Sequence, residues 1–202
     1  PRNAAQMRTE LERVQTEVGV SDAETITAAM VRFVRTAHFR IAVADVSGLL
    51  PIMRVSDRLS DTATLVLEQT LALAWDELVA RHGTPGGLRP GCTGFAVVGY
   101  GKLGGLEMGY GSDLDVVFLH DLPDGETTGE AALDHSVFVM RLARRIVHLL
   151  SVQTGHGSLY EVDMRLRPSG RSGLLVSSVS AFARYQQKDA WTWEHQALVR
   201  AR

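Results

Sequence analysis

The sequence predicts an α+β protein in which a helical region, residues 1–88, precedes a core of strands and helices, residues 89–202. Three observations lead to this prediction. Apolar residues recur at helical spacing through most of the first region, a turn-rich segment ends it, and strand-like segments follow. With 202 residues, 45% of them hydrophobic, the chain can bury a sizeable core.

Two long helices are predicted in the first region. Apolar side chains recur at helical intervals over residues 26–37 and again over residues 65–79. Pro51 and Gly83 interrupt this pattern, because proline lacks the N–H that a helix interior needs and glycine favours helix ends. The segment 83–91 is rich in glycine and proline, which neither a helix nor a strand tolerates, so it marks the predicted boundary.

Strands and helices follow one another in the core. Residues 95–99 and 114–119 are short apolar runs typical of buried strands. Residues 160–166 alternate between apolar and charged side chains, which predicts a third strand. Residues 131–151 have the periodicity of an amphipathic helix, and helical patterns return from about Val179.

Composition and charge exclude several classes of function. The chain has 21 basic and 23 acidic residues, so no overall positive field would hold it on nucleic acid or on an anionic membrane. No apolar run approaches the roughly 20 residues that cross a bilayer. The single Cys92 and the lack of a signal-peptide pattern indicate a cytoplasmic protein. Because the chain opens on Pro1 and stops within a helical pattern, we expect a piece of something longer.

The candidate catalytic residues are three aspartates on two predicted strands. Asp113 and Asp115 are two positions apart, so they project together at the start of the second strand. Two adjacent carboxylates repel each other unless they share a proton or a cation, and Mg²⁺ prefers oxygen ligands. If the third strand pairs beside the second, Asp163 completes a three-carboxylate site for one or two Mg²⁺ ions. Glu161 shares a face with Asp163 and is a rival for that position.

A glycine-rich loop between the first two strands is the candidate phosphate-binding element. Glycine lets backbone N–H groups approach a phosphate closely, and a lysine adds a point charge. The residues concerned are Gly101, Lys102, Gly104, Gly105 and Ser112. The loop also matches the dinucleotide-binding pattern Gly-x-Gly-x-x-Gly. However, later glycines would break the helix that this pattern requires, and the acidic pair comes too early for it.

Several other residues have more than one interpretation. Arg165 and Arg167 are candidates to bind the phosphate tail of a nucleotide, or to pair with neighbouring acids on an exposed face. The segment 169–173 is either a lid over the site or a plain connection. The tryptophans are expected to pack in the interior. They are Trp75, Trp191 and Trp193.

Three segments carry a resemblance to a known family. They are residues 99–105 running on to 111–115, residues 160–170, and residues 190–198. In their order and in their residues they resemble the bacterial glutamine synthetase adenylyltransferases, within the nucleotidyltransferase superfamily of the polymerase β type. A lone Asp-x-Asp is a weak motif, whereas three long segments in order are specific.

The resemblance implies a fold and an activity. The fold would be a small mixed or antiparallel nucleotidyltransferase sheet flanked by helices. The activity would be the transfer of AMP from ATP to a tyrosine of glutamine synthetase, which regulates nitrogen assimilation. Asp113 and Asp115 would be Mg²⁺ ligands, and Asp163 would orient or deprotonate the tyrosine hydroxyl. The full enzyme of this family also responds to glutamine and to a PII-type signalling protein.

Family members have two such halves, one that adds AMP and one that removes it by phosphorolysis. The motifs Gly-Tyr-Gly-Lys and Gly-Tyr-Gly-Ser-Asp-Leu-Asp resemble those of the C-terminal, adenylylating half. Two other functions stay open. One is the deadenylylating half of the same enzyme, and the other is a non-catalytic regulatory module that binds ATP or a PII-like partner without turnover.

Overall fold

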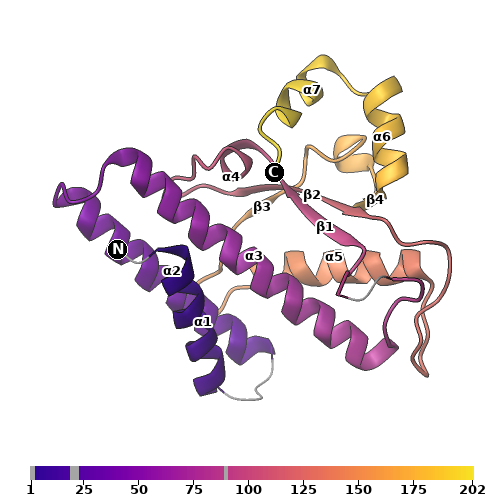
Figure 1. Cartoon of the computed structure of the whole chain (residues 1–202), viewed down its shortest axis with the longest axis horizontal. Coiled ribbons are helices and arrows are strands. Elements are labelled where there is room, and N and C mark those ends of the chain that lie inside the picture. The colour runs from indigo at the N-terminus through magenta and orange to yellow at the C-terminus, as the bar shows by residue number, and fades with distance from the viewer. Residues whose placement is uncertain (1–2, 19–22, 89–90) are drawn as a thin grey trace.

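The computed structural model describes residues 3–18, 23–88 and 91–202 and has the predicted α+β fold. In the described residues, the chain opens with three helices, which form one side of the molecule (Figure 1). They are α1 (Ala4–Val18), α2 (Ala23–Val46) and α3 (Ile52–His82). Pro51 and Gly83 flank α3, and Gly83 adopts the positive φ of 74° that glycine accommodates at a helix end. In the predicted boundary segment, Arg89 and Pro90 lie outside the described residues.

The core is one small sheet with helices around it (Figure 1). Its elements are β1 (Phe95–Gly99), α4 (Gly101–Gly104), β2 (Leu114–His120), α5 (His135–Ser151), β3 (Val162–Asp163), the short 3-10 helix η1 (Gly170–Ser172), β4 (Val176–Ser178), α6 (Val179–Lys188) and α7 (Thr192–Leu198). β1 pairs antiparallel with β2 along its whole length. β3 and β4 both pair with β2 in the parallel sense. The sheet is therefore mixed.

Packing between α3 and α5 joins the opening helices to the sheet. Trp75 of α3 meets Phe138 of α5 edge to face, with ring centroids 5.3 Å apart. Between the same two helices, the Arg145 guanidinium donates two hydrogen bonds to the Glu77 carboxylate, at 2.7 and 2.9 Å. A single hydrophobic cluster runs from α1 to β4 and includes the fully buried Phe118 of β2. The opening helices thus form one wall of the core that positions β2.

The third predicted strand is much shorter than the span 160–166. Its pairing with β2 is limited to the two residues of β3, because the chain turns directly afterwards. The Arg165 N–H donates to the Asp163 carboxylate, and the Arg167 N–H donates to the Met164 carbonyl. The predicted alternation between buried and exposed side chains holds at Tyr160–Glu161 and at Met164–Arg165, whereas Val162 and Asp163 are both half-buried.

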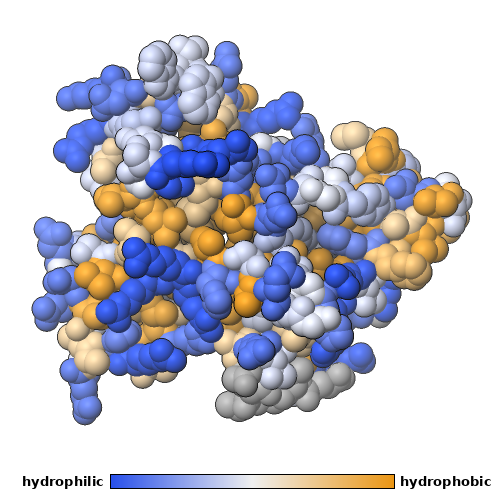
Figure 2. Space-filling model, turned by 180° about the vertical axis from the view of Figure 1, so that it is seen from behind, coloured by the Kyte–Doolittle hydropathy of each residue, from blue (hydrophilic) through white to orange (hydrophobic). Residues whose placement is uncertain are grey.

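Hydrophobic side chains are exposed at the turn between α2 and α3, at the right of Figure 2. Val46, Leu49, Ile52 and Met53 are each between 69% and 91% exposed. Exposed apolar side chains that gather in one place often mark a surface that contacts another protein. No helix in the described part of the chain is both long enough and apolar enough to span a bilayer.

Candidate active site

Three aspartates from two neighbouring strands meet at one end of the sheet. Asp115 on β2 and Asp163 on β3 are partners in the parallel register, and Asp113 directly precedes β2. One carboxylate oxygen from each residue lies within 4.8 Å of the other two. Strand alternation explains the arrangement, because Leu114, between Asp113 and Asp115, turns into the core. The structure thus brings together the three residues predicted as the acidic site.

The charges around this acidic cluster favour a bound cation. Burial raises the pKa of Asp115, and the negative charges of Asp113 and Asp163 raise it further. Arg165 and Lys102 oppose this shift with their positive charges. A divalent cation among the three carboxylates would relieve the same repulsion, and all the donor atoms are oxygens, which suits Mg²⁺.

Arg165 is paired with one member of the acidic cluster. Its guanidinium Nε donates to Asp163 Oδ2 at 2.6 Å, and its main-chain N–H donates to Oδ1 at 2.9 Å. These bonds hold the pKa of Asp163 below its usual range. The Arg165 side chain is itself 69% exposed, so it lies at the rim of the site.

The start of the glycine loop lies directly against the Asp115 carboxylate. A β-carbon placed on Gly101 would lie 2.5 Å from Asp115 Oδ2, and Gly101 has a φ of 53°. The Tyr100 N–H donates to the Asp115 carbonyl at 2.8 Å, which fixes the loop to β2. Lys102 follows in α4 with an exposed side chain. The loop therefore places a backbone turn and one ammonium group beside the acidic cluster.

The other predicted loop residues hold the shape of the loop. A β-carbon on Gly104 would overlap the Arg200 carbonyl, so this glycine allows the end of the chain to pass close by. Gly105 donates its N–H to the Gly101 carbonyl at 3.0 Å. The Ser112 hydroxyl accepts from the Gly109 N–H at 2.9 Å and closes the turn before Asp113.

The family model described as Glutamate-ammonia ligase adenylyltransferase matches residues 1–202. The chain belongs to this family. Similar proteins include the bifunctional glutamine synthetase adenylyltransferase/adenylyl-removing enzymes of Pseudomonas putida, 53% identical over 208 residues, and of Shewanella woodyi, 52% identical over 199 residues. The matches cover 100% and 96% of this chain but 21% of each relative. The chain thus spans about a fifth of the length of these relatives.

In this member of the glutamate-ammonia ligase adenylyltransferase family, a basic loop, residues 164–171, lies beside the acidic cluster. The Arg167 guanidinium donates to the main-chain carbonyls of Met164 and Arg171, at 2.8 and 3.1 Å, and so holds the loop closed. The loop borders a hollow of about 380 Å³, which Asp113 and Glu161 also line. Arg171 faces the hollow and helps to lower the pKa of Asp163. Arg171 lies within the segment 169–173, for which the sequence predicts a lid over the site or a plain connection but no role for this arginine.

The segment 190–198 is held by a buried glutamate that the sequence did not indicate. Glu194 is only 5% exposed, and its carboxylate accepts from the Tyr185 hydroxyl at 3.0 Å and from the Trp191 N–H at 2.8 Å. The expectation that all tryptophans pack in the interior is wrong for Trp191 and Trp193, which are 70% and 53% exposed. The buried carboxylate, rather than the indole rings, holds α7 against α6.

Proposed function

We propose that this chain transfers AMP from ATP to a tyrosine hydroxyl of glutamine synthetase. The observation that carries the proposal is the cluster of Asp113, Asp115 and Asp163 beside a glycine loop, with carboxylate oxygens within 4.8 Å of one another. The names of the Pseudomonas putida and Shewanella woodyi relatives describe a glutamine synthetase adenylyltransferase, which supports the choice of substrate.

In the proposed reaction, a bond forms between the tyrosine oxygen and the α-phosphorus of ATP, and pyrophosphate leaves. Asp113, Asp115 and Asp163 would hold one or two Mg²⁺ ions, and their all-oxygen donor set fits that ion. A bound Mg²⁺ would neutralise the negative charge that develops on the phosphate during transfer. Asp163 has a second proposed role, to orient the tyrosine hydroxyl or to accept its proton.

The nucleotide is proposed to lie over the glycine loop. Main-chain N–H groups and the exposed Lys102 ammonium would contact its phosphates, since both lie beside the acidic cluster. The proposed nucleotide-binding residues are Gly101, Lys102, Gly104, Gly105, Ser112, Arg165 and Arg167. Gly104 and Gly105 would act by shaping the loop, because their N–H groups already donate to the Tyr100 and Gly101 carbonyls. Two of these, Arg165 and Arg167, would exchange part of their present hydrogen bonds with Asp163 and the basic loop for phosphate oxygens.

We also propose that the helical region 1–88 and the core 89–202 belong to a longer cytoplasmic enzyme. The relatives support this, because this chain matches 21% of their length. A PII-type signalling protein is the proposed partner of that longer enzyme. The second activity in the relatives' name, removal of adenylyl groups, is the rival proposal for the same site.

The test is mass spectrometry of glutamine synthetase after incubation with the protein and MgATP. We expect an added AMP on one tyrosine, and we expect the Asp113→Asn/Asp115→Asn variant to lose it by at least about a hundredfold because the metal ligands are removed. Asp124→Asn, which changes an exposed acid in the loop after β2, is the matched control and should keep full activity. Formation of ADP from phosphate and adenylylated glutamine synthetase, without forward transfer, would favour the rival activity.

A further inference from the structure

The segment that follows β4 contacts both of the loops beside the acidic cluster. It comprises α6, α7 and residues 199–202, and we call residues 179–202 the bridging segment. Its two helices lie side by side in Figure 1, and the chain after α7 runs back to the start of the glycine loop. Residues 190–198 within it belong to the segments that resemble the family, yet the proposed reaction uses none of its side chains.

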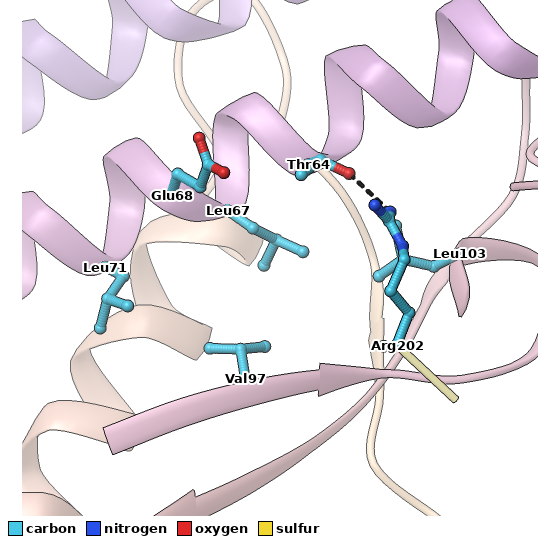
Figure 3. Close-up of a pocket in the computed structure, with 8 residues that line it drawn as sticks. Thr64, Leu67, Glu68, Leu71, Val97, Leu103 and Arg202 are labelled. Carbon is cyan, nitrogen blue, oxygen red and sulfur yellow. Dashed lines mark hydrogen bonds between the residues drawn. The ribbon is translucent and has the colours of Figure 1, made fainter. Parts of the chain in front are cut away.

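One end of the bridging segment is fixed to the glycine loop. Gly99 donates its N–H to the Arg202 carbonyl at 2.8 Å, and Arg202 donates its N–H to the Gly99 carbonyl at 2.9 Å. The Arg202 guanidinium reaches α3 beside a hollow of about 260 Å³ and donates to the Thr64 hydroxyl at 3.0 Å (Figure 3). A β-carbon on Gly104 would overlap the Arg200 carbonyl. The chain after α7 therefore packs directly against the glycine loop.

The other end of the bridging segment contacts the basic loop. The Tyr185 hydroxyl of α6 lies against the main chain of Ser169. Ser169 has a φ of 61°, a conformation that a residue with a side chain keeps only where its surroundings hold it. Next to it, the Gly170 N–H donates to the Arg167 carbonyl at 2.8 Å, and Arg171 faces the hollow of the acidic cluster. Tyr185 thus contacts the basic loop at its turn.

Glu194 lies at the centre of the bridging segment. Its buried carboxylate accepts from the Tyr185 hydroxyl at 3.0 Å and from the Trp191 N–H, which precedes α7, at 2.8 Å. Burial raises the pKa of Tyr100 in the glycine loop, and the negative charge of Glu194 raises it further, so the two side chains are close. Glu194 therefore has one neighbour in the glycine loop and another that contacts the basic loop.

We propose that Glu194 is a positioning residue for the nucleotide. Through Tyr185 it holds the basic loop in place, and through α7 it connects this loop to the glycine loop. The inference rests on the proposed function, in which both loops contact the phosphates of ATP. Glu194 touches neither the nucleotide nor the metal. It acts because a loop that is ordered before ATP arrives loses less conformational freedom on binding, which makes ATP bind more tightly.

Tyr185→Phe tests the inference, since it removes one hydroxyl and leaves the Trp191 N–H on Glu194. We expect the Kd of MgATP, measured by calorimetry, and the KM for ATP to rise by about two- to tenfold, the range that one hydrogen bond allows. The kcat should stay within about twofold, because the loops hold ATP equally before and during transfer. Tyr160→Phe is the matched control, since its hydroxyl lies 3.4 Å from His38 instead, and it should change none of these values.

Hydrogen exchange measures the contact between Tyr185 and the basic loop without any nucleotide. In Tyr185→Phe the Gly170 amide should exchange at least about threefold faster, because the loop opens locally more often. Amides of α5, which lies away from this loop, should keep their exchange rates and so show that the variant is folded.

The inference is overturned if Gly170 exchange is unchanged, or if Tyr185→Phe binds MgATP as tightly as the wild type. In either case AMP transfer by the wild type would leave the proposed function standing. A fall in kcat at unchanged KM would show a purely structural role and would likewise overturn the inference. Failure of the wild type to bind MgATP would overturn the proposed function, and the inference with it.

Discussion

The Asp115 carboxylate rests against Gly101, so closely that a β-carbon at Gly101 would come within 2.5 Å of Asp115 Oδ2. Gly101 also has a φ of 53°, which costs a residue with a side chain about 1–2 kcal/mol. The glycine loop and the acidic cluster are therefore one unit, since neither can move without the other.

Gly101→Ala should displace Asp115 and reduce AMP transfer by at least about tenfold, because a displacement of about 1 Å at a reacting site can cost a hundredfold. Its free energy of unfolding should fall by about 1–2 kcal/mol. Transfer rates and urea unfolding curves check both outcomes. Gly111→Ala is the matched control, since a β-carbon there meets open space and the residue has no positive φ. Equal activity of the two variants would contradict the coupling between the glycine loop and the acidic cluster.

Arg165 should compete with a metal ion for Asp163. Its guanidinium is bonded to Asp163 Oδ2, which is a proposed ligand atom. We therefore expect Arg165→Gln to bind Mg²⁺ about two- to fivefold more tightly without ATP, the range that an exposed ion pair allows. Isothermal calorimetry measures the affinity, and Arg184→Gln, at an exposed position in α6, is the control. Weaker Mg²⁺ binding by Arg165→Gln would show that the pairing helps to form the site.

The acidic cluster could be predicted because its signals are local. The two-residue spacing of Asp113 and Asp115 places both side chains on the same face of their strand. The alternation of apolar and charged residues around Asp163 likewise predicts the face on which its side chain lies. Alternation does not, however, say which strands are neighbours. The direct pairing of Asp115 with Asp163 depends on the parallel register of β2 and β3, which tertiary packing decides.

Other features depend on contacts between distant residues, which a single sequence does not reveal. Gly104 must be a glycine because the Arg200 main chain passes against it, almost a hundred positions later. The sequence suggests that Glu194 is an exposed helix residue. It is buried instead, because the Tyr185 hydroxyl and the Trp191 N–H donate hydrogen bonds to its carboxylate. The short length of β3 likewise follows from the Asp163 carboxylate, which turns the chain at Arg165.

His38 should make the protein less stable in mild acid. Burial lowers its pKa, and its Nε2 lies 3.4 Å from the Tyr160 hydroxyl. The unfolded chain binds a proton on this histidine from about pH 6.5 downward, whereas the folded chain does so only at lower pH. Between these values the unfolded state binds more protons, so the free energy of unfolding falls as the pH falls.

Urea unfolding at pH 7.5 and pH 5.5 measures this dependence. We expect the loss of stability between the two pH values to be smaller in His38→Gln than in the wild type. The pKa of His120 is also lowered by burial, so part of the loss should remain and should shrink again in a His38→Gln/His120→Gln variant. An unchanged loss in both variants would contradict the assignment to these two histidines.

Glu194 should be essential for the packing of α6 and α7. Glu194→Ala leaves the Tyr185 hydroxyl and the Trp191 N–H without their acceptor, which should cost about 1–3 kcal/mol. Glu194→Gln keeps the size of the side chain and one acceptor oxygen, so it should cost less. Thermal unfolding followed by tryptophan fluorescence compares the two. Equal stability of Glu194→Ala and the wild type would show that the buried hydrogen bonds contribute nothing.

The central claim is that Asp113, Asp115 and Asp163 hold the metal ions that AMP transfer requires. Anomalous diffraction from crystals soaked with Mn²⁺ and a non-hydrolysable ATP analogue tests it directly, because Mn²⁺ accepts the same oxygen ligands as Mg²⁺. We predict at least one anomalous peak within about 2–2.5 Å of oxygens from these carboxylates. The claim would be contradicted if no peak were found at this position, although Mn²⁺ was saturating and the analogue was bound elsewhere on the protein.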